Sequence, residues 1–134
     1  MKTSLVTGGA GFIGSHLVDK LLSMGHNVIV LDNETSDGHD QYYWNDRATN
    51  YPVDIRTFWH IADKFRGVDY VYHLAAKASV QASIAKPMDT METQVMGTVN
   101  VLEAARAAGV EKFIYSSTSA CYGNNNPIPN TEIM

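Results

Sequence analysis

The chain has 134 residues, enough for one domain with a core of its own. Hydrophobic residues make up 45% and charged residues 18%, a balance that is ordinary for a globular protein and argues against intrinsic disorder. Fourteen acidic residues against ten Lys and Arg leave a net charge of −4, so the composition gives no sign of the basic surface that binds nucleic acid or an anionic membrane.

Short apolar runs alternate with longer amphipathic stretches along the chain. The short runs predict buried strands. The longer stretches repeat apolar residues every three or four positions, as Met91, Val95, Val99 and Leu102 do, which predicts helices. In chain order the expected elements are strand 4–7, helix 12–24, strand 27–31, a loop over 33–51 with at most a short strand near 48–51, helix 55–65, strand 68–74, helix 87–108 and strand 112–116. This order predicts an α/β fold in which a parallel sheet of about five strands has helices on both faces.

A glycine-rich loop joins the first expected strand to the first expected helix and reads Thr-Gly-Gly-Ala-Gly-Phe-Ile-Gly over residues 7–14. Gly8 permits a tight turn, Gly11 lets the backbone approach a pyrophosphate, and Gly14 lets the helix pack closely on the strand. The helix N-terminus adds free N–H groups and a partial positive charge. Asp32 follows Gly14 by 18 residues, near the spacing of about 20 expected for a carboxylate that binds the adenosine ribose.

These features predict a Rossmann-type doubly wound sheet that binds a dinucleotide and prefers NAD over NADP. The Asp32 carboxylate would repel the 2′-phosphate of NADP, and no arginine follows it closely. The alternative is a bare helix-start loop beside a surface aspartate, without a ligand.

No pattern for a disulfide, a metal site or a membrane span is present in the sequence. A single cysteine, Cys121, excludes an intrachain disulfide and a cysteine-based metal cluster, and is compatible with a reducing compartment. The histidines are scattered without the spacing of zinc ligands, at His16, His26, His39, His60 and His73. With no apolar run of about 18 residues and no convincing targeting segment, we expect no membrane association and a cytoplasmic location.

Several separate blocks that together span essentially the whole chain resemble one protein family. They are Thr-Gly-Gly-Ala-Gly-Phe-Ile-Gly-Ser-His-Leu (7–17), Leu-Asp-Asn (31–33), Asp-Ile-Arg (54–56), His-Leu-Ala-Ala (73–76), Gly-Thr-Val-Asn-Val-Leu-Glu-Ala-Ala (97–105) and Phe-Ile-Tyr-Ser-Ser-Thr (113–118) running on to Tyr-Gly (122–123). In these blocks the chain resembles the N-terminal, cofactor-binding half of an extended short-chain dehydrogenase/reductase of the nucleotide-sugar epimerase/dehydratase kind.

The resemblance implies a set of cofactor-binding residues, each assigned to one part of NAD. Gly8, Gly11, Phe12 and Ile13 would line the pyrophosphate, Asp32, Asn33 and Ser36 would hold the adenosine ribose, Asp54 and Ile55 would meet the adenine, and Leu74, Ala75 and Ala76 would pass near the nicotinamide-side ribose. Simpler roles are also open. Asp54 would serve equally as the N-cap of helix 55–65, and residues 74–76 as the plain end of a strand.

Two residues depart from the family pattern. Gln94 stands where the family usually has asparagine, which moves the amide outward by one methylene. Lys77 stands where glutamine or glutamate is common. Its ammonium could reach a phosphate, but we expect an exposed, solvated lysine.

The catalytic motif of the family is absent from the sequence. The family's chemistry uses a Ser or Thr together with Tyr-x-x-x-Lys, in which the lysine lowers the pKa of the tyrosine. Thr118 matches the Ser/Thr position as a vestigial catalytic residue, but no tyrosine of the chain has a lysine four positions later. The resemblance therefore implies a single truncated NAD-binding domain over residues 1–134, with an irregular tail at 123–134, that lacks the C-terminal part of the family fold.

Three functions fit this interpretation. The first is an NAD-binding module without sugar chemistry of its own, the second is half of an epimerase or dehydratase completed in trans by another chain, and the third is a degenerate fragment that keeps only the fold. The absent part would leave an apolar face on helix 87–108 and an open edge at strand 112–116. We expect this surface to form a homo-oligomer, and the alternative is a monomer whose tail covers it.

Overall fold

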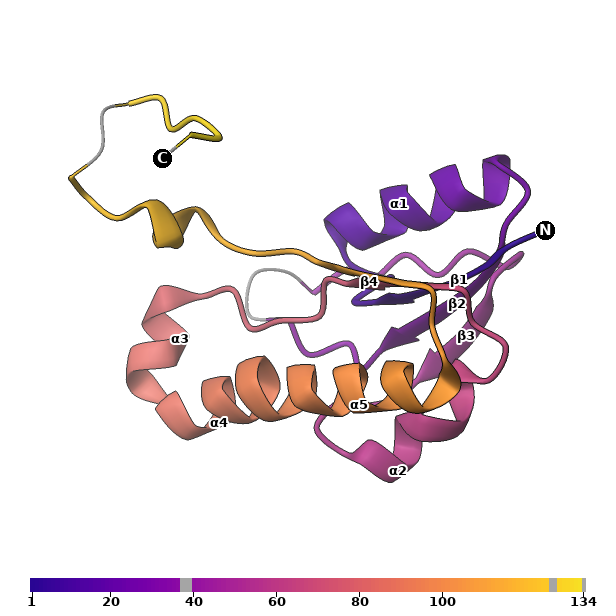
Figure 1. Ribbon diagram of the computed structural model, residues 1–134. Helices are drawn as coiled ribbons and strands as arrows, with labels where there is room; N and C mark the ends of the chain where they lie inside the picture. Colours follow the sequence, from indigo (N-terminus) through magenta and orange to yellow (C-terminus); the bar gives the residue numbers. More distant parts are fainter. Residues whose placement is uncertain (37–39, 126–127, 134) are drawn as a thin grey trace.

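Five parallel strands form one sheet in the computed structural model of the chain, which describes residues 1–36, 40–125 and 128–133 (Figure 1). The strands are β1 (Thr3–Thr7), β2 (Asn27–Asp32), β3 (Thr49–Pro52), β4 (Tyr70–His73) and β5 (Lys112–Tyr115). Their spatial order is β3-β2-β1-β4-β5. The chain thus builds β2 and β3 on one side of β1, then crosses over to add β4 and β5 on the other. This arrangement confirms the expected fold class.

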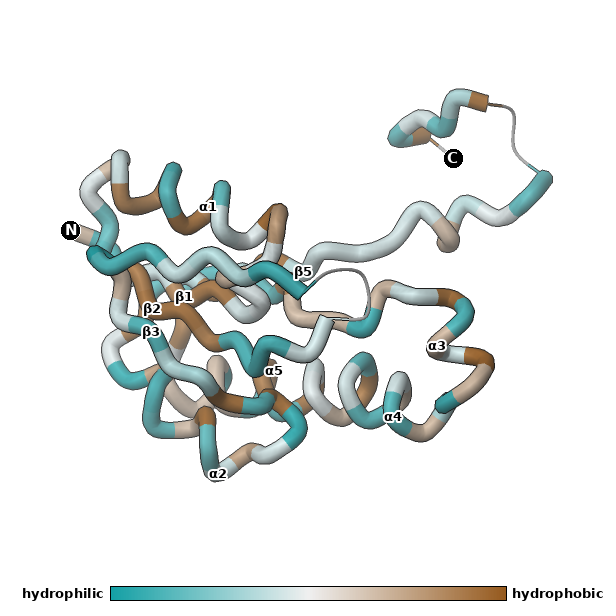
Figure 2. Tube along the Cα trace, turned by 180° about the vertical axis from the view of Figure 1, so that it is seen from behind, coloured by the Kyte–Doolittle hydropathy of each residue, from teal (hydrophilic) through white to brown (hydrophobic). Residues whose placement is uncertain are grey.

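The central strand β1 is buried on both faces, as the strands of a parallel sheet covered by helices must be. Leu5 pairs in register with Ile29 of β2 and Val71 of β4 and belongs to one hydrophobic core. The next residue, Val6, points to the opposite face and packs in a second core with Val18. Hydrophobic residues accordingly concentrate along β1 and β2 in Figure 2.

Helices cover the two faces unequally (Figure 1). The helix α1 (Phe12–Ser23) lies on one face and contributes Val18 and Leu21 to its core. On the other face lie α2 (Phe58–Ile61) with the 3-10 turn η1 (Ala62–Phe65), and α5 (Thr98–Ala108). The short helices α3 (Val80–Ala85) and α4 (Pro87–Met91) precede α5, and a π-helical segment η2 (Glu92–Gly97) joins α4 to α5.

Several boundaries differ from the sequence-based expectations. The helix expected from residue 55 begins at Phe58, because residues 54–57 form a turn closed by a hydrogen bond from Thr57 N to Asp54 O. Its last part is a 3-10 turn rather than α-helix. The strand expected from residue 68 begins at Tyr70, since Val68 N still bonds to Phe65 O of the preceding turn.

The helix expected over residues 87–108 is continuous in the chain but changes its hydrogen-bonding register at η2. The helix α3 was not expected. It is short, and Ser79 caps it by accepting a hydrogen bond from Ala82 N.

An apolar stripe runs along the outer side of α4, η2 and α5. Its members are spaced three or four residues apart and are between 45% and 73% exposed: Met88, Met91, Val95, Val99 and Leu102. The opposite side of α5 packs Val101, Ala104 and Ala105 into the core. This helix therefore carries apolar side chains both toward the sheet and toward solvent.

Beyond β5 the chain leaves the sheet and includes one further 3-10 turn, η3 (Ser119–Tyr122) (Figures 1 and 2). Residues 123–125 and 128–133 are in neither helix nor strand, and residues 126, 127 and 134 of the expected tail lie outside the described part. Within the described ranges, no helix is long and apolar enough to cross a membrane.

Candidate functional site

A cleft of about 320 Å³ opens at the carboxyl ends of the strands, near the point where the strand order reverses between β1 and β4. The loops after β1, β2, β3 and β4 all contribute to its wall. All the residues that the resemblance assigns to the cofactor lie in this wall: Gly8, Gly11, Phe12, Ile13, Asp32, Asn33, Ser36, Asp54, Ile55, Leu74, Ala75 and Ala76. The structure thus brings the expected set together from four separate loops.

The glycine loop is packed so tightly that a side chain could not replace Gly8 or Gly14. Gly8 has φ +70°, and a Cβ there would lie 2.9 Å from the backbone N of Ala75. A Cβ on Gly14 would lie 2.1 Å from Gly8 O. The loop is also tied to the sheet, because Gly8 N donates to Leu31 O at 2.7 Å. The backbone itself therefore forms this side of the cleft.

The N-terminus of α1 opens onto the cleft and carries no side-chain cap. Its N-cap residue is Gly11, and no acidic residue lies in the first turn. Phe12 and Ile13 both line the cleft, and their exposed side chains flank this helix start. The uncapped N–H groups and the helix dipole favour an anionic group at this position. The residues present fit the pyrophosphate of a dinucleotide, which the helix start would hold.

Asp32 at the end of β2 is held in a fixed orientation by the backbone. Its Oδ2 accepts a hydrogen bond from Ala10 N at 3.1 Å, and its Oδ1 accepts one from Glu34 N at 2.8 Å. Each carboxylate oxygen keeps a second lone pair that can accept a hydrogen bond from a ribose hydroxyl. The carboxylate can therefore bind a ribose without giving up either backbone contact.

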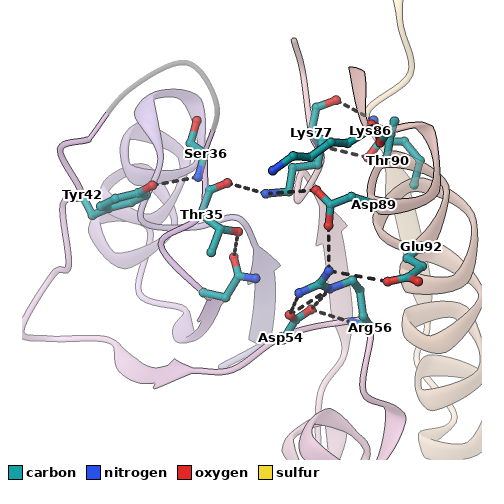
Figure 3. A network of polar contacts seen from close by, with 12 residues as sticks. Thr35, Ser36, Tyr42, Asp54, Arg56, Lys77, Lys86, Asp89, Thr90 and Glu92 are labelled. Carbon is teal, nitrogen blue, oxygen red and sulfur yellow. Dashed lines mark hydrogen bonds and ion pairs between the residues drawn. The ribbon is translucent and has the colours of Figure 1, made fainter. Parts of the chain in front are cut away.

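Asp54 belongs to an ion-pair network that is centred on Arg56, on the β3 side of the cleft (Figure 3). Arg56 donates to Asp54 from Nε and Nη2, at 2.9 and 2.7 Å, and donates to Asp89 of α4 from Nη1 at 2.9 Å. Glu92 completes the network at 3.6 Å from the same guanidinium nitrogen. Burial alone would raise the pKa of Asp54, but the hydrogen bonds from Arg56 outweigh it and hold that pKa below its usual value.

The simpler role considered for Asp54, as the N-cap of the second helix, is wrong. The N-cap position is Thr57, which makes no side-chain cap. Asp54 Oδ1 instead accepts from Arg56 N at 2.9 Å, which closes a tight turn before the helix. The network thus anchors the turn that carries Asp54 and Ile55 into the cleft.

The residues after β4 are held by a buried chain of three polar side chains. Thr7 Oγ1 accepts hydrogen bonds from Leu74 N and Ala75 N, both at 3.1 Å. Its own hydrogen is then directed to His73 Nδ1 at 2.7 Å, so His73 carries its hydrogen on Nε2 and donates it to Thr98 Oγ1 at 3.0 Å. Burial lowers the pKa of His73 to about 4, so this imidazole is neutral at pH 7. The chain fixes the backbone of Leu74 and Ala75 in the cleft wall.

Lys77 is not a freely solvated lysine, and that expectation is wrong. Its side chain is 12% exposed and lines the cleft, where Nζ donates to Thr35 O at 2.6 Å (Figure 3). Gln94 on η2 holds the Lys77 backbone with both amide atoms. Its Oε1 accepts from Lys77 N at 2.9 Å and its Nε2 donates to Lys77 O at 2.6 Å. The two departures from the family pattern are therefore in contact with each other.

Thr118 lies apart from the residues that line the cleft. It is exposed, and its Oγ1 accepts from Ala120 N at 3.1 Å to cap η3. Ser116, at the end of β5, is the part of this segment that reaches the cleft wall.

Several lining residues were not singled out from the sequence. Thr35 and Tyr42 belong to the segment expected to be a loop, in which no motif distinguishes them, and Thr93 lies on the unexpected π-helical segment. Among the described residues, no group of three or more His, Cys, Asp or Glu side chains is placed to hold a metal ion. His39 lies outside the described part.

Comparison with known proteins places this chain in one family. A family model described as the NAD dependent epimerase/dehydratase family matches residues 4–134. A UDP-glucose 4-epimerase of Klebsiella pneumoniae is 36% identical over 96% of this chain and 97% of its own length. One from Lacticaseibacillus casei is 37% identical over 95% of this chain but only 38% of its own length.

Solved structures agree with the sequence matches. The UDP-glucose 4-epimerase of Thermotoga maritima, solved with UDP-glucose, has a TM-score of 0.84 and 41% identity, over 94% of this chain and 41% of that one. The enzyme of Thermus thermophilus, solved in complex with NAD, has a TM-score of 0.78 and 41% identity, over 87% of this chain and 37% of that one. The chain spans about two fifths of the length of most of these relatives, and it belongs to the NAD-dependent epimerase/dehydratase family.

Proposed function

We propose that the chain binds NAD in the cleft at the carboxyl ends of β1, β2 and β4. The observation that supports this most directly is the convergence of the glycine loop, Asp32, Asp54 and residues 74–76 on one cleft. The Thermus thermophilus relative, at 41% identity, was solved in complex with NAD. The cofactor would supply a hydride acceptor, and the residues of this chain would bind and orient it.

Each wall of the cleft has a role that follows from its chemistry. The uncapped N-terminus of α1 would hold the pyrophosphate, and Asp32 with Asn33 and Ser36 would hold the adenosine ribose. Asp54 and Ile55 would lie against the edge of the adenine. Leu74, Ala75 and Ala76 would support the nicotinamide-side ribose from below.

NAD is proposed over NADP because of charge. The Asp32 carboxylate is fixed by two backbone N–H groups and cannot turn away from a ribose bound beside it. A 2′-phosphate there would meet a negative charge, and Glu34 places a second carboxylate two residues further along the same loop.

We further propose that this chain does no sugar-nucleotide chemistry by itself. The sequence contains no Tyr-x-x-x-Lys, and an unassisted tyrosine with a pKa near 10 is a poor base at neutral pH. A second candidate is half of an epimerase or dehydratase completed by other residues in trans. The exposed apolar stripe favours this candidate, because another polypeptide could dock there. The remaining hypothesis, a degenerate fragment, predicts a stable fold without ligand binding.

The apolar stripe also supports self-association. Its five side chains lie at helical spacing on α4, η2 and α5, so two copies could pair these helices about a twofold axis. A monomer whose residues 123–125 and 128–133 fold back over the stripe is the alternative. A cytoplasmic location stays a prediction from the single cysteine.

Calorimetric titration with NAD, and with NADP for comparison, tests the proposed function. We expect a dissociation constant for NAD of about 10 μM to 1 mM, and NADP weaker by about tenfold. Replacing Asp32 by Asn should reduce the difference in affinity between NAD and NADP. The substitution removes the repulsion between the carboxylate and the 2′-phosphate and keeps the shape of the side chain. Binding of neither cofactor by the wild-type chain would overturn the proposal in favour of the degenerate fragment.

A further inference from the structure

Lys77 brings an ammonium group into the wall of the cofactor cleft from the loop after β4. The group crosses to the loop after β2, where it donates to Thr35 O at 2.6 Å (Figure 3). Only 12% of the side chain is exposed, so solvent compensates its charge poorly.

Protein groups compensate this charge only in part. Thr35 O is a neutral acceptor. Among the described residues, the one carboxylate oxygen within ion-pair distance is Asp89 Oδ2 at 4.0 Å, which is too far for a hydrogen bond. The other oxygen of Asp89 already accepts from Arg56 at 2.9 Å. Because an ammonium has three N–H donors, two of them are left for another acceptor.

The backbone that carries this ammonium is rigidly held. Gln94 bonds to both the N–H and the C=O of Lys77, at 2.9 and 2.6 Å. It projects from the π-helical segment η2, whose altered register is a feature common at functional sites. A glutamine is one methylene longer than the asparagine of the family pattern, and here that longer side chain spans to the loop after β4. The Lys77 side chain therefore extends from a backbone position that Gln94 holds in place.

Lys77 has no cationic competitor in the described wall of the cleft. The charged side chains that line it are Asp32, Asp54 and Lys77. Arg56 neutralises Asp54 through several hydrogen bonds and is itself occupied by three carboxylates. A diphosphate that enters the cleft would thus find one full positive charge there, in addition to the partial charge of the α1 N-terminus.

We propose that Lys77 binds the diphosphate of the dinucleotide and that Gln94 positions it for that contact. The inference rests on the proposed function, because it assigns a further residue to the same site. The ammonium keeps its bond to Thr35 O and directs its remaining N–H groups to phosphate oxygens, which also ties the loops after β2 and β4 together over the ligand.

Comparison of a charged and an uncharged ligand tests the contact. NAD and adenosine are titrated into the wild-type chain and into Lys77→Met, Lys77→Arg and Lys86→Met, at low and high salt. Lys86 is the matched control, since it is an exposed lysine nearby in the chain that lies outside the cleft wall. Nuclear magnetic resonance titration follows adenosine, because we expect it to bind more weakly than NAD.

We expect Lys77→Met to weaken NAD binding about tenfold and to reduce its salt dependence, and to change adenosine binding less than about twofold. Lys77→Arg should retain most of the affinity, and Lys86→Met should match the wild-type chain. Equal affinity of Lys77→Met and wild-type for NAD would overturn the inference and leave the proposed function standing. An equal loss for NAD and adenosine would also overturn it, since that pattern indicates a structural role.

A double-mutant cycle tests the positioning role of Gln94. Gln94→Leu should weaken NAD binding when Lys77 is present and have much less effect in the Lys77→Met background. Additive losses would overturn the positioning role. A wild-type chain that binds no NAD would overturn the proposed function together with this inference, and it would be seen before any variant is compared.

Discussion

At the scale of single residues, His73 links the pH dependence of stability to the cleft wall. It is buried as a neutral imidazole between Thr7 and Thr98, and its pKa lies near 4 instead of 6.5. Between about pH 4 and pH 6.5 the unfolded chain protonates His73 while the folded chain does not. The contribution of His73 to the free energy of unfolding therefore falls by at most about 3 kcal/mol as the pH falls from about 6.5 to about 4. Above about pH 6.5 this contribution is constant.

Chemical denaturation between pH 4 and pH 8 measures this loss. His73→Asn should be less stable at neutral pH and should show a shallower decline between pH 6.5 and 4. The exposed His60 provides the control, because His60→Asn should keep the wild-type slope. An unchanged slope in His73→Asn would show that other groups cause the acid sensitivity. Asp54, whose pKa is lowered in the folded chain, causes a further loss of stability only below about pH 4.

At the scale of elements, the junction of β1 and α1 depends on close backbone packing at Gly14. A Cβ added to Gly14 would lie 2.1 Å from Gly8 O and 2.8 Å from Gly9 Cα, and backbone atoms cannot yield as a flexible side chain can. Gly14→Ala should therefore push α1 away from the loop, lower the free energy of unfolding by about 3 kcal/mol and weaken NAD binding.

Gly25→Ala is the matched control for this prediction. Gly25 has φ +85°, but a Cβ added there would have no atom within 4 Å, so only backbone strain of about 1 kcal/mol is expected. Thermal unfolding and NAD titration of both variants measure the difference. Equal stability of the two variants would contradict the importance of this close approach.

The sequence predicted those elements whose signals are local. The β1–α1 junction combines an apolar strand, three spaced glycines and a helical repeat within a few residues, and the structure has it where expected. The helix α3 was missed because it has only six residues, in which Val80 and Ile84 are too few to show a helical repeat, and one hydrogen bond from Ala82 N to Ser79 caps it. The register change at η2 has no sequence signal either.

The contact of Lys77 with Thr35 was missed for a different reason. The two residues lie on separate loops, and their approach depends on how β2 and β4 flank β1. Motif spacing describes one loop at a time and cannot show such an approach. The sequence contains a hint only for the contact between Lys77 and Gln94, because both residues depart from the family pattern.

At the scale of the whole molecule, the apolar stripe should decide the state of association. Val99 belongs to the part of the stripe on α5 and is 50% exposed, and a charge there would oppose the burial of the stripe against another copy. Sedimentation velocity over a range of concentrations should show self-association of the wild-type chain and a monomer for Val99→Glu. Trp59→Glu changes another exposed apolar residue, on α2, and should associate like the wild-type chain.

A monomeric wild-type chain would remove the support for a homo-oligomer. Association that Val99→Glu leaves intact would point instead to the outer edge of β5, which pairs with β4 alone.

The strand order has a consequence for the way the chain folds as it is made. Of the five strands, β1 is synthesised before the others and occupies the middle of the sheet, and β2 and β3 then add in turn on one side of it. After the crossover, β4 and β5 add in turn on the other side. Each of these later strands therefore joins an edge that already exists when it emerges, so the five-stranded sheet can grow outward during synthesis without separating strands that are already paired.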